Sequence, residues 1–280
     1  MIEFKRTNVT TSDEARLNIL EAGSGPPLLL IPGWSQTAAI YRHQLEGLSD
    51  RYRVIALDLR GHGESQNVEY GYRLSRLAMD VHEVISALDL EAVSVLGHSM
   101  GNAILFCHWD LFGRDRFSKL IIAEQPPTLL AQPDWSLTER EIAGCITTAE
   151  QMCKTCENLV GADAEKFAAE LVTGMLSPAV SREDREFIIK QNLMMPRQAA
   201  STLYQNTASA DWRDLIPRID IPTLIVAGKA SIVPFASQQW IQVHVPGAKL
   251  VAFEGNEGGS HFMFFENFKK FNRTVAEFLD

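Results

Sequence analysis

The feature that most constrains the fold of this chain is a regular alternation of short apolar runs with segments of helical period. Six apolar runs have the length of a strand: 28–31, 53–58, 92–97, 119–124, 223–228 and 249–255. Between them lie segments such as 73–90, whose apolar residues fall on one face of a helix. Strands that alternate with helices indicate βαβ units and a mostly parallel sheet. Its inner strands are apolar throughout because helices cover both faces. The first twenty residues predict an antiparallel hairpin (2–9 with 15–23) at the sheet edge.

The alternation stops between residues 126 and 210. Helical stretches follow one another there without a convincing strand: 138–159, 164–175, 182–192 and 197–207. A chain of 280 residues suits one large domain or one domain with an insertion. We therefore expect a core domain formed by 1–125 and 211–280, and a helical cap formed by 126–210. The apolar residues of this cap either pack against the core or line a substrate pocket, and packing is the default.

One serine lies between two glycines where a strand gives way to a helix. In SVLGHSMGNA (94–103), Ser99 follows an apolar run and precedes a helical one. A sharp strand-to-helix turn projects a serine hydroxyl into a cleft, and glycines at 97 and 101 remove side chains that would clash. The G-x-S-x-G string alone also occurs in ordinary turns. Its place between a buried strand and a helix favours a nucleophile.

Four further segments, spread over nearly the whole chain, resemble those of a known family. These segments are LLLIPGWSQ (28–36), VIALDLRGHGES (54–65), LIVAGKASIVP (224–234) and GGSHFMFFENFKKFN (258–272). With the serine elbow, they resemble the serine-nucleophile members of the α/β-hydrolase fold family, although Pro32 stands where histidine is common. The resemblance implies an α/β fold with a mostly parallel twisted sheet flanked by helices. It also implies that His261, in the loop before the last helix, is the general base.

The other histidines have structural interpretations. We expect His98 to be structural or to line the pocket, His62 to stabilise its turn, and His108 to be a satisfied interior residue. His82 is expected on a helix face.

The acid of the triad departs from the family pattern. The position that usually holds aspartate is Ser231, which cannot stabilise an imidazolium as a carboxylate does. Glu124 ends the strand after the elbow helix, where some family members, including lactonases of the zearalenone-degrading type, place their acid. We therefore assign the acid to Glu124; the alternative is that it only caps the entrance to the insertion. Glu254 and Glu257 are the reserve candidates.

The elbow also predicts where the oxyanion is bound. The resemblance implies that the backbone N–H groups of Met100 and Trp34 donate to it. Around these residues we expect a pocket lined by Gly33, Ser35, His98, Pro127 and Ile232.

Together these residues predict acyl transfer through an acyl-enzyme. The expected substrate is a small or medium apolar carboxylic ester or lactone. A C–C bond hydrolase, a perhydrolase of the cofactor-free haloperoxidase type, a hydroxynitrile lyase or a cofactor-free dioxygenase of the same fold remains an alternative. A non-catalytic small-molecule receptor is a further one. Ser99 argues against the dehalogenases and epoxide hydrolases, which use an aspartate nucleophile. No cofactor and no metal site is expected.

The composition of the chain argues against some classes of binding partner. A net charge of −9 without a Lys/Arg run argues against nucleic acid as a partner. No apolar stretch approaches membrane-spanning length, and the N-terminus lacks a signal-peptide pattern, so no membrane association and a cytoplasmic location are expected. The four cysteines are too sparse for a disulfide framework, and CKTC (153–156) is interpreted as part of a helix. The oligomeric state, monomer or homodimer, stays open.

Overall fold

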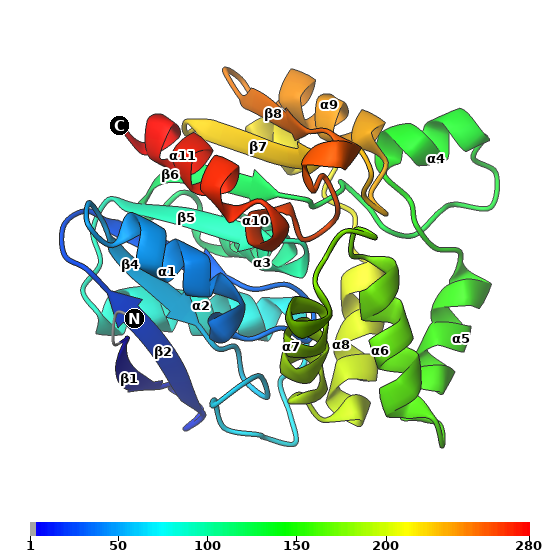
Figure 1. The fold of residues 1–280 in the computed structure, drawn as a ribbon, viewed down its shortest axis with the longest axis horizontal. Helices are drawn as coiled ribbons and strands as arrows, with labels where there is room; N and C mark the ends of the chain where they lie inside the picture. Colours follow the sequence, from blue (N-terminus) through cyan, green and yellow to red (C-terminus); the bar gives the residue numbers. More distant parts are fainter. Residues whose placement is uncertain (1–3) are drawn as a thin grey trace.

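A mixed sheet of eight strands forms the centre of the molecule, as a computed structural model of residues 4–280 describes it (Figure 1). The strands are β1 (Lys5–Thr10), β2 (Arg16–Ala22), β3 (Pro27–Ile31), β4 (Arg53–Leu57), β5 (Val93–His98), β6 (Phe117–Ala123), β7 (Thr223–Gly228) and β8 (Lys249–Phe253). Their order in the sheet is β1-β2-β4-β3-β5-β6-β7-β8. The strands from β4 to β8 pair in parallel, and β1 and β2 add the expected antiparallel edge. Residues 2 and 3 of the predicted hairpin lie outside the described residues.

Helices cover both faces of this sheet. They are α1 (Arg42–Leu48), α2 (Leu74–Ala87), α3 (Met100–Phe112), α4 (Leu137–Ala143), α5 (Ala149–Val160), α6 (Ala164–Gly174), α7 (Arg182–Leu193), α8 (Arg197–Ala208), α9 (Phe235–His244), α10 (Met263–Glu266) and α11 (Phe268–Leu279). Short 3₁₀ turns lie at Ala38–Tyr41, Ile216–Arg218 and Gly255–Glu257.

Two hydrophobic clusters, one on each face, explain the continuous apolar strands. In β3, Leu29 packs with the cluster that contains α2 and α3, whereas Leu28 and Leu30 pack with the cluster that contains α1, α10 and α11. Successive side chains of a strand point to opposite faces, so both sets must be apolar. The predicted fold class, a mostly parallel sheet flanked by helices, is confirmed.

The parallel register brings three strand ends to one edge. His98 is level with Ala123, and Ala123 is level with Val226. The residues that follow β5, β6 and β7 therefore meet at the carboxyl edge of the sheet. The strand order reverses between β3 and β5, and in open α/β sheets ligands bind at such a switch point.

Five helices, α4–α8, lie between β6 and β7 and are called the helical insertion below. Helices α5–α8 pack side by side beyond the carboxyl edge, and α4 packs on α9 (Figure 1). The single helix expected over 138–159 is two helices: Gly144, at a φ of 84°, ends α4, and Thr148 caps the start of α5. The division of the chain into a core and a separate cap unit stays a prediction.

Among residues 4–280, every helix is too short or too polar to cross a lipid bilayer.

Candidate active site

Ser99 occupies a strained turn between β5 and α3. Its φ of 50° and ψ of −126° lie in a region that side-chain-bearing residues rarely adopt. A Cβ at position 97 would lie 2.5 Å from Asn102 Oδ1, and one at position 101 would lie 2.2 Å from the Ile31 carbonyl oxygen. Asn102 also donates a 2.6 Å hydrogen bond to the Gly97 carbonyl. The two glycines of the motif are therefore required by the close approach of strand, helix and β3.

His261 and Glu124 meet beside this turn. Glu124 follows β6 directly at a φ of 58°, and His261 precedes α10. His261 Nδ1 lies 3.3 Å from Glu124 Oε2, and both side chains are buried. The reserve acids lie elsewhere: Glu254 pairs with Lys229 at 2.5 Å and Glu257 pairs with Lys270 at 2.8 Å. Glu124 is thus the carboxylate that the fold places against His261.

Two hydrogen bonds hold the Glu124 carboxyl group. The Gly228 amide donates to Oε1 at 2.5 Å, and the Ser231 hydroxyl donates to Oε2. Ser231, at the position where the resemblance places the acid, therefore contacts Glu124, the carboxylate that lies against His261. Burial raises the pKa of Glu124 to about 8, and the two hydrogen bonds oppose this rise. Burial also lowers the pKa of His261 to about 4, so its imidazole is neutral and able to accept a proton at pH 7.

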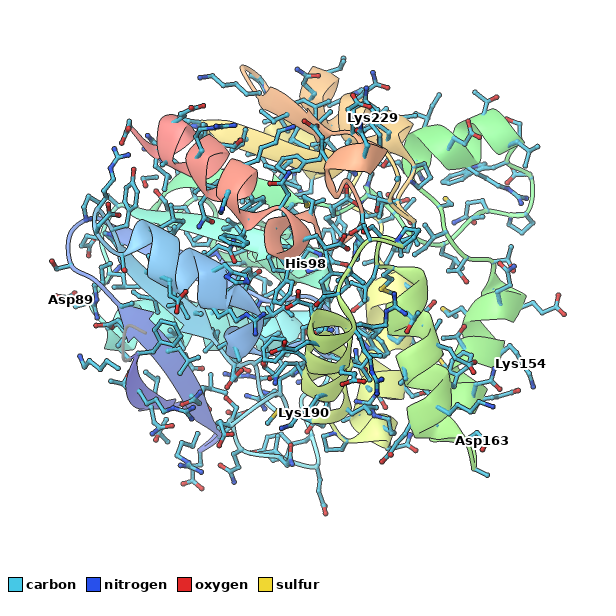
Figure 2. The ribbon with its side chains drawn as sticks, in the orientation of Figure 1. Asp89, His98, Lys154, Asp163, Lys190 and Lys229 are labelled. Carbon is cyan, nitrogen blue, oxygen red and sulfur yellow. The ribbon has the colours of Figure 1, made fainter. Side chains whose placement is uncertain are left out.

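His98, labelled in Figure 2, is buried and supports the loop that carries His261. Its Nε2 donates to the His261 carbonyl oxygen at 2.8 Å, and the two ring centroids are 4.7 Å apart. His98 thereby positions His261, and it also lines the cavity described below. It thus has both the structural and the pocket-lining position expected from the sequence.

The loop after β3 lies against the elbow. A Cβ at Gly33 would lie 3.3 Å from Ser99 Cβ, so glycine permits this approach. Trp34 Nε1 donates to the Ala200 carbonyl of α8 at 2.8 Å, and Ser35, at a φ of 56°, donates from Oγ to the Asn192 carbonyl of α7 at 2.7 Å. On the other side, the His261 amide donates to the Met175 carbonyl at 3.2 Å. The helical insertion thus holds both loops that flank Ser99.

One cavity of about 70 Å³ joins these groups. Seven of the predicted site residues line it: Ser99, His261, Met100, Trp34, Gly33, His98 and Ile232. Within residues 4–280, the Ser99 hydroxyl makes no hydrogen bond to His261, as is common before a substrate draws such groups together.

Two predicted pocket residues are misplaced. Ser35 turns its hydroxyl to α7 instead of the cavity, and Pro127 is held away from it because its carbonyl accepts from the Trp212 amide at 2.9 Å. Their sequence neighbours Gln36 and Pro126 line the cavity instead.

Three polar residues of the cavity wall were not predicted. The side-chain amide of Gln36, Asn192 Nδ2 and Thr207 Oγ1 are buried without a hydrogen-bond partner in the described part of the chain. Gln36 could have been found, because it is the last residue of the segment LLLIPGWSQ (28–36), which carries part of the family resemblance. Asn192 and Thr207 lie on α7 and α8, and only tertiary packing brings them here.

The structure agrees with the prediction for His62 and only in part with that for His108. His62 Nδ1 lies 2.8 Å from the Arg60 carbonyl within its own turn, in line with the prediction. His108 is buried as expected, but it is not satisfied: neither ring nitrogen has a partner within residues 4–280.

Comparisons with known proteins agree with this architecture. The family model for the alpha/beta hydrolase fold matches residues 26–268. The AB hydrolase superfamily protein YisY of Bacillus subtilis is 29% identical over 275 residues, which cover 96% of this chain and 97% of that protein. The non-heme chloroperoxidase CPO-A1 of Kitasatospora aureofaciens is 25% identical, with coverage of 97% and 98%. The solved structure of the esterase EaEST from Exiguobacterium antarcticum superposes with a TM-score of 0.88 at 24% identity, with coverage of 98% and 99%. Since the family model spans most of the chain and the fold agrees, the protein belongs to the alpha/beta hydrolase fold family.

Proposed function

We propose that the protein is a serine hydrolase that cleaves a carboxylic ester or lactone through an acyl-enzyme. One observation carries the proposal: Ser99, on its strained turn, opens into the same cavity as a buried His261 that lies against Glu124. A nucleophile, a base and a group that orients the base are the minimum that acyl transfer needs.

In this mechanism the Ser99 hydroxyl attacks the substrate carbonyl carbon while His261 accepts its proton. The Glu124 carboxylate fixes the imidazole tautomer and stabilises the imidazolium that forms. The N–H groups of Met100 and Trp34 donate to the developing oxyanion, each contributing about 2.7–4 kcal/mol. His261 then protonates the departing alkoxide, and water, activated by the same imidazole, releases the acid.

The cavity supports a short acyl group. At about 70 Å³ it is small, and its walls are mostly apolar. It shares five residues with an open groove of about 800 Å³: Trp34, Ile146, Met175, Tyr204 and Ile232. A short acyl chain in the cavity and a larger alcohol portion in the groove would fit both. The unpartnered amide of Gln36 favours an acyl group that carries one polar atom.

Covalent labelling tests the proposal. A fluorophosphonate is incubated with wild type, Ser99→Ala and Glu124→Ala, and the adduct is located by peptide mass spectrometry. We expect an adduct on Ser99 that is absent in Ser99→Ala and much slower in Glu124→Ala. A folded wild type that does not label would overturn the serine mechanism.

A second candidate is perhydrolysis, favoured by the similarity to the non-heme chloroperoxidase. In that reaction hydrogen peroxide, instead of water, attacks the acyl carbon of the Ser99 acyl-enzyme and gives one proton to His261. The ester bond to Ser99 then breaks, Ser99 regains the proton and the peracid is released. The ratio of peracid to acid formed from one ester at fixed peroxide concentration distinguishes the two functions.

A further inference from the structure

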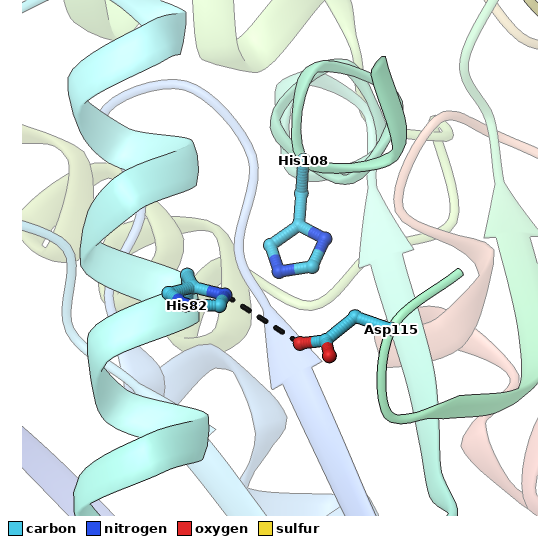
Figure 3. Close-up of side chains that lie close together, drawn as sticks. All are labelled: His82, His108 and Asp115. Carbon is cyan, nitrogen blue, oxygen red and sulfur yellow. Dashed lines mark ion pairs between the residues drawn. The ribbon is translucent and has the colours of Figure 1, made fainter. Parts of the chain in front are cut away.

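Three metal-ligating side chains meet at the end of α3 that is remote from Ser99. His82 lies on α2, His108 on α3, and Asp115 in the turn between α3 and β6. One ligand atom from each lies within 4.8 Å of the other two (Figure 3). His108 follows Ser99 by nine residues, which is about 14 Å along a helix. The group is therefore separate from the active site.

Among the residues that the structure describes, His108 is buried without the hydrogen bonds that its ring nitrogens could make. Its ring is fully buried, and both nitrogens lack a hydrogen-bond partner within residues 4–280. A neutral imidazole has one donor and one acceptor, and buried polar atoms are normally paired. The ring stacks on Phe117 at 4.5 Å and lies 4.9 Å from Phe112, so aromatic neighbours fix its plane without offering a polar contact.

His82 and Asp115 complete a donor set around it. His82 Nδ1 lies 3.5 Å from Asp115 Oδ2, close enough for an ion pair but outside good hydrogen-bond geometry. The His82 ring stacks on Phe112 at 4.1 Å, so one phenylalanine contacts both histidines. The side chains of His82 and Asp115 are each 31% exposed, which gives an ion a path to the buried nitrogen.

We propose that His82, His108 and Asp115 bind one divalent transition-metal ion, with zinc as the best fit. Two imidazoles and one carboxylate form a donor set that zinc accepts, with a water in the fourth position. Zinc bonds of about 2.0–2.2 Å place ligand atoms about 3.3 Å apart, so the exposed Asp115 and the half-buried His82 close on His108 by an ångström or so. The bound ion ties α2, the end of α3 and the turn before β6 together. Its role is structural, and the proposal is independent of the proposed function.

Metal titration of the chelator-treated full chain tests this site. Zinc chloride is titrated by calorimetry, thermal unfolding is followed with and without zinc, and cobalt(II) absorption reports the coordination geometry. We expect one equivalent bound per chain, a higher melting temperature with zinc, and the visible bands of four-coordinate cobalt. His108→Leu should abolish all three effects, and Asp115→Asn should weaken zinc binding at least tenfold.

A matched histidine provides the control. His244 lies outside the group, where its ring stacks on Trp240 at 3.8 Å and its Nδ1 contacts the Trp240 carbonyl. His244→Leu should bind zinc like wild type, and His82→Gln replaces His108→Leu if the latter does not fold. Absence of stoichiometric binding in wild type, or binding that survives both His82→Gln and His108→Leu, would overturn the site.

Discussion

Two histidines and one carboxylate lie near each end of α3, in opposite environments: His98, His261 and Glu124 near its start, and His82, His108 and Asp115 near its end. At its start, His98, His261 and Glu124 are all buried and each has a polar partner, although His98 is paired through Nε2 alone and its Nδ1 has none in the described chain. At its end, His108 is buried without a partner in the described chain, while Asp115 is exposed. Two histidines and a carboxylate therefore do not define a function by themselves. Partners that fix a proton's position suit base catalysis, whereas free nitrogen atoms suit an ion.

The largest expected difference in kcat is between variants of His261, near the start of α3, and of His108, near its end. We expect His261→Ala to lower kcat for p-nitrophenyl acetate by about 10⁶-fold, because the base and the nucleophile act as one unit. His108→Ala should stay within about twofold of wild type, because it lies about 14 Å further along α3. Steady-state kinetics with both variants checks the contrast. A comparable loss in both would mean that the two ends of α3 are not functionally separate.

The next contrast concerns the carboxylates. Glu124→Gln should lower kcat by about 10⁴-fold, because the imidazolium loses its compensating charge, whereas Asp115→Asn should leave kcat unchanged. The double variant Glu124→Ala/Ser231→Asp places a carboxylate at the family's usual position. We expect it to recover part of the activity that Glu124→Ala loses, measured in the same assay. Equal activity of Glu124→Ala and Glu124→Ala/Ser231→Asp would mean that a carboxylate at position 231 cannot replace the one at position 124.

The pH dependence of kcat/KM tests the effect of the hydrogen bond that Ser231 donates to Glu124. The proposed mechanism requires the carboxylate form of Glu124, whose pKa is raised to about 8, so kcat/KM should increase as the pH rises through that value. The pKa of His261, about 4, places its titration well below this range. Ser231→Ala removes a donor that stabilises the carboxylate, so the rise should move to higher pH by about one unit. A rise that stays in place in Ser231→Ala would show that another group controls it.

The active site could be predicted from sequence further than the second histidine group could. Strand ends, the serine elbow and the histidine loop are encoded locally, and parallel pairing then brings Ser99 and Glu124 to one edge. The break in the helix expected over 138–159 depends on one glycine, and a single glycine within a helical pattern is ambiguous. The second histidine group depends on the packing of α2 against α3, which brings the ring centroids of His82 and His108 to within 5.6 Å of each other, and no local pattern predicts that contact.

The smallest effect is on stability, and it distinguishes the ends of α3 without any assay of function. In metal-free protein, His108→Leu should raise the free energy of unfolding by about 1–2 kcal/mol, because it replaces two buried unpaired nitrogens with apolar atoms. His98→Leu should lower it by a similar amount, because the His261 carbonyl loses its donor. Urea unfolding in EDTA measures both values, and added zinc should then stabilise wild type but not His108→Leu. A destabilising His108→Leu in EDTA would mean that the ring packs better than its polar atoms indicate. Opposite signs at the two ends would show that a buried histidine without hydrogen bonds lowers stability, whereas one that donates to a buried carbonyl raises it.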